Sequence, residues 1–349
     1  MDNLGLQTFA DKNLKGKVCL SPFVSFEISV NGDTSLCHCN AWMPSPVGNL
    51  FESSLEEILS NQKSQAIRKS IIDGNYRYCN EQTCGVLNHN QLNEGDTIPG
   101  VIQQLLDDST RYVMPHEIRI AGDLTCNLSC PSCRLEIIKS SPEEIERRRQ
   151  LGKQLSKNLF SVPTSKQIRV HVSTSGEIFA SPLLLEFVQN MPVNEFPGLE
   201  LCIQTNGLLM ADRWERLGVM SDRVSMITVT TDAARADTYE KLRRGGKWDN
   251  VNRNLKWLQQ KKQETKMAFH MRMVVQYDNY QEIEEFYNYS KQLGADVVEY
   301  GRITDWGTFG NQFHKHDVFD PNHPEYQPAQ DILNRIKAKP DIFLSGGLS

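Results

Sequence analysis

The sequence predicts an α/β protein in which a small α/β domain precedes an open, partial (β/α)6 barrel. The length of 349 residues fits two domains, or one barrel-sized domain with an appendage. From about residue 116, short apolar strands alternate six times with amphipathic helices, which indicates parallel strands joined by right-handed crossovers. Six units are too few for a closed eightfold barrel, so we expect an open one whose ligands bind at the carboxyl ends of the strands.

Residues 1–86 are expected to form the small domain. Phe23–Val30 alternates in polarity as a strand does, and an Asn-Gly turn leads into a returning strand at Thr34–Cys37. Ser53 or Ser54 is placed to cap one helix, which continues at helical spacing to Gly74. Residues 87–115 are polar and turn-rich, so we interpret them as a linker.

Residues 116–304 are expected to form the barrel. Its strands are predicted at Glu117–Ala121, Gln167–Val172, Leu199–Gln204, Val224–Val229, Met267–Val275 and Asp296–Arg302. Its helices are predicted near 132–158, 181–191, 210–218, 236–262 (broken at Gly245-Gly246) and 280–293. Residues 305–349 form a carboxyl-terminal extension with a helix near 328–339 and a flexible end.

The net charge of −5 argues against a general electrostatic hold on nucleic acid or on an anionic membrane. No apolar run approaches the length of a membrane span, and the first ten residues lack the basic and apolar regions of a signal peptide. We therefore expect a cytoplasmic protein without nucleic-acid or membrane partners.

The nine cysteines are the informative part of the composition. An odd number in a chain without an export signal is a poor disulfide framework, whereas a reducing compartment keeps thiols for metals, redox chemistry or catalysis. Eight of them form two groups: Cys19, Cys37, Cys39, Cys79 and Cys84, and then Cys126, Cys130 and Cys133. The ninth, Cys202, lies within a strand and is expected to be a small buried hydrophobe.

Cys126, Cys130 and Cys133 follow the first barrel strand with C-x3-C-x2-C spacing. Three thiolates so close together suit three irons of a 4Fe–4S cluster and leave the fourth iron open, which is typical of a working site. The alternative is zinc, but no nearby His or Cys is an obvious fourth ligand.

Further motifs follow the later strands: Gly176-Glu177, Thr205-Asn206-Gly207, and then Thr230 and Asp232. Asp232 is the first residue of a D-x6-Y-x3-R-x-G run. Each alone is an ordinary turn or loop, but together with the cysteines they resemble the radical SAM superfamily. The resemblance implies that Gly176 and Glu177 hold the amino group of S-adenosylmethionine. It also implies that Thr205 and Asn206 belong to the cofactor site, and that Thr230 and Asp232 lie near the ribose and the substrate. Ser132 departs from the aromatic residue that often precedes the third cysteine in this family.

The resemblance implies a radical SAM enzyme. Its cluster would cleave S-adenosylmethionine to a 5′-deoxyadenosyl radical, which removes a hydrogen atom from a substrate peptide or small molecule. A reducing partner such as flavodoxin or ferredoxin would supply the electron.

The first cysteine group resembles the SPASM/twitch auxiliary-cluster domain, which in many relatives follows the barrel rather than preceding it. The resemblance implies that Cys19, Cys37, Cys79 and Cys84 hold a second 4Fe–4S cluster, with Cys39 as an alternative to Cys37. A four-cysteine zinc knuckle remains the other interpretation.

The sequence does not identify the substrate. Maturation of a peptide or natural product is the first hypothesis, and dehydrogenation or epimerisation of a sugar or nucleoside is the second. A non-enzymatic iron–sulfur or zinc protein is a third hypothesis from another class. His314, His316 and His323 also have metal-ligand chemistry, although histidines in surface loops are usually not ligands.

Overall fold

The computed structural model describes residues 1–37, 42–88, 90–94, 114–138, 140–172 and 175–348. The chain divides into two compact units that interleave in sequence. Unit 1 comprises residues 1–123, 142–175 and 182–200, and unit 2 comprises residues 124–141, 176–181 and 201–349.

Unit 1 contains a mixed run of strands in the order β7-β6-β2-β3-β4. Strand β2 pairs antiparallel with β3 and parallel with β6, which pairs parallel with β7. The bounds are β1 (Lys17–Val18), β2 (Ser25–Ile28), β3 (Asp33–Ser35), β4 (Gly48–Asn49), β5 (Asn93–Glu94), β6 (Glu117–Ile120) and β7 (Ile168–Val172). The predicted hairpin is confirmed, and its first strand also extends the sheet of the first barrel strand.

The helices of unit 1 are α1 (Ser21–Val24), α2 (Leu55–Ser60), α3 (Gln62–Ile72), α4 (Gly85–Asn88), α6 (Pro142–Leu159) and α7 (Pro182–Gln189). The single helix predicted from Ser54 to Gly74 is wrong. Asn61 ends α2 in an extended conformation, and its side chain accepts a hydrogen bond from the Ser64 amide, which starts α3. Ser54 caps α2 in a capping box with Glu57, as its position predicted.

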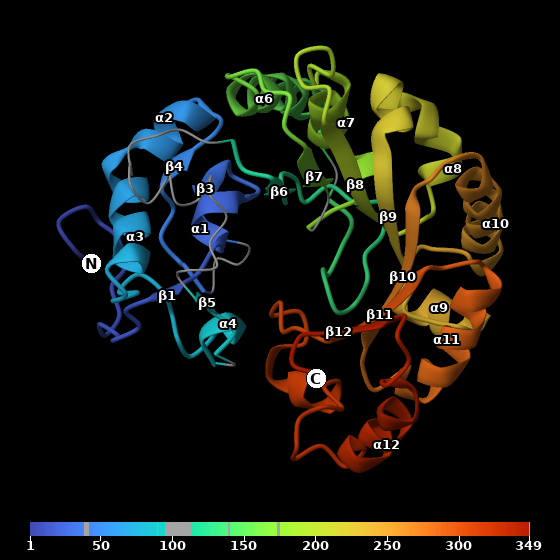
Figure 1. Ribbon diagram of the computed structural model, residues 1–349. Coiled ribbons are helices and arrows are strands. Elements are labelled where there is room, and N and C mark those ends of the chain that lie inside the picture. The colour runs from blue at the N-terminus through green and yellow to red at the C-terminus, as the bar shows by residue number, and fades with distance from the viewer. Residues whose placement is uncertain (38–41, 89, 95–113, 139, 173–174, 349) are drawn as a thin grey trace. The chain divides into compact units, whose positions relative to one another are not determined.

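Unit 2 contains parallel strands in the order β8-β9-β10-β11-β12. Their bounds are β8 (Leu199–Thr205), β9 (Val224–Thr230), β10 (Ala268–Val275), β11 (Val297–Arg302) and β12 (Ile342–Ser345). Figure 1 shows α9 (Ala236–Leu242), α10 (Trp248–Glu264) and α11 (Ile283–Gln292) on one side of these strands. The remaining helices are η2 (Ile178–Ala180), α8 (Met210–Arg213), η3 (Trp214–Arg223), η4 (Tyr280–Glu282), η5 (Gly310–Lys315) and α12 (Tyr326–Ile336).

The alternation along β10 shows which face of the unit 2 sheet is covered. Phe269, Met271 and Met273 are fully buried, whereas Arg272 between them remains partly exposed and forms an ion pair with Glu299 of β11. Apolar side chains at every second position therefore pack on one face, and polar side chains occupy the other.

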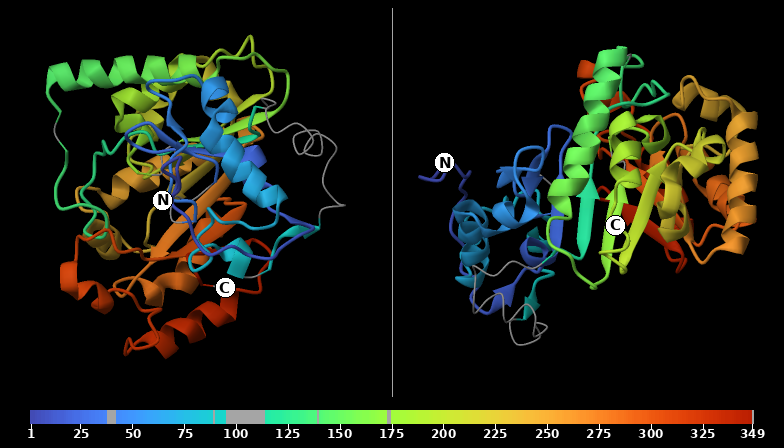
Figure 2. Two further views of the ribbon diagram at one scale, coloured as in Figure 1. Left: turned by 90° about the vertical axis from the view of Figure 1, so that its left-hand side faces the viewer. Right: turned by 90° about the horizontal axis from the view of Figure 1, so that it is seen from above.

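The predicted α/β class with a large, mostly parallel sheet is confirmed, and all six predicted barrel strands are present. Two further expectations are wrong. The helix expected from residue 132 begins at Pro142, after a long loop; it is the green helix that stands out in both views of Figure 2. The end expected to be flexible contains β12, which pairs in parallel with β11.

Candidate functional site

The loop that carries Cys126, Cys130 and Cys133 belongs to unit 2, and each of its three thiols faces an N–H donor. Cys126 Sγ lies 3.8 Å from Asn206 Nδ2, Cys130 Sγ lies 3.8 Å from Arg243 Nη1, and Cys133 Sγ lies 3.5 Å from Arg134 Nη2. N–H donors stabilise negatively charged sulfur, so this donor set fits thiolates that ligate a metal cluster.

Glu177 is completely buried and links two of the predicted motifs. Its carboxylate accepts hydrogen bonds from Thr205 Oγ1 (2.8 Å), the Asn206 amide (2.7 Å) and the Phe179 amide (3.2 Å). Its own amide donates to the carbonyl of Thr125, just before the first cysteine (2.9 Å). Glu177 therefore fixes the loops after β7 and β8 against the cysteine loop.

Asn206 joins the same network from the end of β8. Its Nδ2 donates to Asn127 Oδ1 at 2.9 Å and lies near Cys126, while its Oδ1 accepts from the Leu208 amide at 3.0 Å. Both the Nδ2 and the Oδ1 atoms of the Asn206 side chain therefore have partners, and these hydrogen bonds fix its orientation at the cysteine loop.

Asp232 follows β9 in the left-handed region, with φ of 60°. Its Oδ1 accepts from the Val274 amide (2.8 Å), and its Oδ2 lies 2.8 Å from Arg243 Nη2. Asn279 Nδ2 donates to the Asp232 carbonyl at 2.8 Å. The strained backbone is thus held by contacts on three sides.

Burial dominates the electrostatics of the site. It raises the pKa values of the Cys126 and Cys130 thiols, and the charge of Arg243 partly opposes the shift at Cys130. Burial also raises the pKa of Glu177, against the hydrogen bonds from Asn206 and Thr205. Charged forms are therefore costly here unless a cation or a ligand compensates them.

The structure brings Cys126, Glu177, Thr205 and Asn206 into one hydrogen-bonded network and joins Asp232 to Cys130 through Arg243. Thr230 stands apart from this network. Its hydroxyl is buried and has no hydrogen-bond partner among the described residues, which leaves it free to bond a ligand. Gly176 directly precedes Glu177 in the same loop of unit 2.

Sequence reasoning assigned no role to Arg243 and Arg244. Arg244 Nε donates to Ser129 Oγ (3.1 Å), its Nη2 donates to the carbonyl of Leu135 (2.7 Å), and its carbonyl accepts from the Ser129 amide (3.1 Å). The two arginines therefore hold the second half of the cysteine loop, from Ser129 to Leu135. The available signal was the arginine of the D-x6-Y-x3-R-x-G run, which the structure places beside Cys130.

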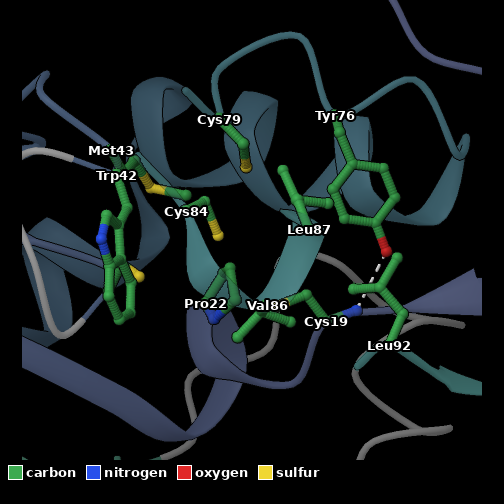
Figure 3. Close-up of a pocket in the computed structure, with 11 residues that line it drawn as sticks. Cys19, Pro22, Trp42, Met43, Tyr76, Cys79, Cys84, Val86, Leu87 and Leu92 are labelled. Carbon is green, nitrogen blue, oxygen red and sulfur yellow. Dashed lines mark hydrogen bonds between the residues drawn. The ribbon is translucent and has the colours of Figure 1, made fainter. Parts of the chain in front are cut away.

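The second candidate site lies in unit 1, where Cys19, Cys37, Cys79 and Cys84 line one pocket. The other lining side chains include Pro22, Met43, Val86, Leu87 and Leu92. Figure 3 shows the sulfur atoms of Cys79 and Cys84 directed into the space between these residues. Four thiols in an apolar pocket suit a closed cluster that no polar substrate reaches.

Tyr76 supports this pocket. Its hydroxyl accepts from the Cys19 amide (3.0 Å; Figure 3) and also donates to the Lys17 carbonyl (2.9 Å). Burial raises the pKa values of the Cys19 and Cys79 thiols, because the apolar pocket disfavours the charged thiolate. Cys39 lies outside the described residues, so the alternative between Cys37 and Cys39 remains a prediction.

The thiols are not arranged as a single-ion site. Within the described ranges, no three His, Cys, Asp or Glu side chains converge closely enough to hold one metal ion, and this includes His314, His316 and His323. Zinc needs sulfur atoms about 2.3 Å away, whereas a four-iron cluster spreads its ligands around a larger core. Cys202 is buried in β8 near Ser225, as predicted for a core thiol.

Comparison with protein families gives two matches. The radical SAM superfamily model matches residues 124–289, and the model of the SPASM iron–sulfur cluster-binding domain matches residues 19–85. The chain therefore belongs to the radical SAM superfamily of enzymes. More particularly, it is a member that carries a SPASM domain ahead of its radical SAM domain. This family confirms the predicted cofactors, which are a 4Fe–4S cluster with S-adenosylmethionine and auxiliary iron–sulfur.

Three solved structures illustrate the similarity. That of anSMEcpe with bound AdoMet is 17% identical and covers 54% of this chain and 51% of its own, with a TM-score of 0.38. Streptococcus suis SuiB bound to the precursor peptide SuiA is 13% identical, with coverages of 86% and 65% and a TM-score of 0.45. A radical SAM methyltransferase from Sphaerobacter thermophilus is 14% identical, with coverages of 64% and 64% and a TM-score of 0.37.

The chain spans about half the length of anSMEcpe. All three TM-scores lie below 0.5. A comparison with curated proteins gives no significant match. No helix in the described part of the chain is long and apolar enough to cross a bilayer.

Proposed function

We propose that the protein is a radical SAM enzyme that modifies a peptide. Cys126, Cys130 and Cys133 hold the cluster whose fourth iron binds S-adenosylmethionine. The observation that carries this proposal is the loop in which all three thiols meet N–H donors, within the region that matches the superfamily. When bound, the reduced cluster and S-adenosylmethionine supply a 5′-deoxyadenosyl radical that abstracts a hydrogen atom.

The residues of this chain then bind and orient the cofactor. Glu177 and Gly176 present the loop that receives the amino group, and Thr205 and Asn206 hold that loop in place through the hydrogen bonds to Glu177. The unpartnered Thr230 hydroxyl and Asp232 stand at the end of β9, where the ribose and the substrate are expected. Burial of these groups excludes water from the reacting atoms.

In unit 1, Cys19, Cys37, Cys79 and Cys84 hold a second 4Fe–4S cluster. Four protein ligands leave no iron open, so this cluster carries electrons rather than substrate. We further propose that a flavodoxin or ferredoxin supplies the reducing electron and that the protein works in the cytoplasm, where reducing conditions keep thiols available for clusters.

A peptide is favoured by an open cavity of about 780 Å³ in unit 2. Lys241, Tyr277, His314 and Lys315 are among its lining residues. One lining residue, Lys241, lies two positions before Arg243, whose Nη1 is 3.8 Å from Cys130 Sγ. An open cavity of this size, lined by charged and aromatic side chains, suits an extended polar segment better than a small enclosed sugar.

The test uses reconstituted protein with dithionite and S-adenosylmethionine under anaerobic conditions, with 5′-deoxyadenosine measured by mass spectrometry. We expect the product from the wild type and from Cys202→Ala, the matched core-thiol control, but not from Cys126→Ala. No product from protein whose clusters are intact by EPR would reject the enzyme in favour of a non-enzymatic iron–sulfur protein.

The substrate class has its own test. A short precursor peptide encoded beside the gene is expected to raise the yield of 5′-deoxyadenosine and to change in mass. If sugars or nucleosides are modified and such peptides are not, the peptide assignment is wrong and the second hypothesis replaces it.

A further inference from the structure

Arg243 is a buried cation placed directly against one of the cysteine sulfurs. Its side chain is 12% exposed, its Nη1 lies 3.8 Å from Cys130 Sγ, and its Nη2 lies 2.8 Å from Asp232 Oδ2. One terminal nitrogen of the guanidinium thus faces a thiol, and the other faces a carboxylate. Its Nε has no hydrogen-bond partner among the described residues.

The backbone fixes this orientation. The Arg243 amide donates to the Tyr239 carbonyl (2.7 Å), and its carbonyl accepts from the Gly246 amide (2.7 Å). Gly245 has φ of +98°, and a Cβ on Gly246 would come within 2.9 Å of the Tyr239 hydroxyl. The tight turn therefore requires glycines, and it directs the preceding arginine towards the cysteine loop.

The turn is also attached to the loop that it faces. Arg244 hydrogen-bonds Ser129, just before Cys130, and the Leu135 carbonyl, two residues after Cys133. The position of Arg243 relative to Cys130 is therefore held by contacts that do not involve Arg243 itself. A side chain held in this way is suited to exert a fixed electrostatic effect.

We propose that Arg243 is a positioning residue that raises the reduction potential of the cluster held by Cys126, Cys130 and Cys133, acting through Cys130. This inference rests on the proposed function, because it requires those cysteines to be ligands. Reduction adds one negative charge to the cluster, so a cation beside a ligand sulfur stabilises the reduced form more than the oxidised form. Asp232 weakens this effect without cancelling it, since its carboxylate lies on the other side of the guanidinium.

The experiment is an anaerobic redox titration of the reconstituted holoprotein, followed by EPR, in the wild type, Arg243→Gln and Arg243→Lys. Added S-adenosylmethionine identifies the signal of the site cluster, and the auxiliary cluster serves as the reference within the same molecule. At a fixed potential, Arg243→Gln is expected to lower the ratio of reduced to oxidised site cluster about tenfold, which corresponds to ~59 mV for one electron. Arg243→Lys keeps the charge and is expected to stay close to the wild type.

An unchanged site-cluster potential in Arg243→Gln would overturn the inference, as would equal shifts in the Gln and Lys variants. If Arg243→Gln does not assemble the cluster, Asp232→Asn provides the test, because removing the opposing carboxylate is expected to raise the potential. A potential unchanged or lowered in Asp232→Asn would then overturn it. A wild type without any S-adenosylmethionine-sensitive signal would instead reject the proposed function, and this inference with it.

Discussion

Replacement of Glu177 by Gln tests whether this buried carboxylate holds the site together. Its two oxygens accept from the backbone amides of Phe179 and Asn206 as well as from Thr205 Oγ1. In Gln, one oxygen becomes an NH2 group, so one of the two backbone N–H groups loses its acceptor. The Thr205 hydroxyl is able to rotate, but a backbone N–H is not.

A buried donor left without an acceptor costs about 1–3 kcal/mol. Loss of the buried charge offsets part of this cost, since burial already raises the pKa of Glu177. We therefore expect a local loss of about 1–2 kcal/mol, which makes the loops open about 5- to 30-fold more often.

Hydrogen–deuterium exchange of the holoprotein measures this opening directly. Amides in residues 205–208 and 177–181 are expected to exchange about 5- to 30-fold faster in Glu177→Gln. The control is Glu215→Gln, at an exposed position of η3, which should leave these amides unchanged. Unaltered protection of both segments in Glu177→Gln would refute the account of Glu177 as the link between the two loops.

Three further predictions follow from other contacts. Arg244→Ala removes the hydrogen bonds to Ser129 and Leu135, so the iron content is expected to fall towards that of the auxiliary cluster alone. Full iron occupancy would show that these hydrogen bonds are not needed to hold the cysteine loop. Tyr76→Phe leaves the Cys19 amide and a carbonyl without their partner, a loss of about 1–3 kcal/mol, and calorimetry should show earlier melting than in the exposed control Tyr277→Phe. Burial raises the pKa of Glu27 from 4.5 to about 7, so the folded protein binds this proton more tightly than the unfolded chain does. The resulting contribution to stability is fully present below pH 4.5 and is lost as the pH rises through 7. The fall in thermal stability between pH 5.5 and 8 should therefore be smaller in Glu27→Gln, and an equal fall in both proteins would contradict this origin.

Periodicity predicted the strands because alternating apolar residues are a local property, as in Phe269, Met271 and Met273 of β10. It missed β12 because four residues before a glycine-rich end contain no repeat, and their strand exists only through pairing with β11. The merged helix before Gly74 was wrong for a related reason. Asn61 is compatible with a helix, but its side chain hydrogen-bonds the Val47 carbonyl, a contact that no local pattern reveals.

In the candidate site too, local patterns were predicted from the sequence and long-range contacts were not. Cysteine spacing and short motifs predicted Cys126, Glu177, Asn206 and Asp232 as site residues because these residues follow successive strands. The sequence did not show that the Glu177 carboxylate is buried and bonded to Thr205 and Asn206, nor that Arg243 reaches Cys130 from 113 positions away. Such contacts depend on which loops meet, and this is decided by the packing of the whole unit.

The central claim is that Cys126, Cys130 and Cys133 hold a cluster with an open iron that binds S-adenosylmethionine. Electron–nuclear double resonance of the reduced protein with cofactor labelled with ¹⁵N at its amino group tests it most directly. We predict nitrogen coupling to the cluster in the wild type and in Cys84→Ala, and its loss in Cys126→Ala. Coupling that survives in Cys126→Ala, or that is absent from wild-type protein saturated with the cofactor, would contradict the claim.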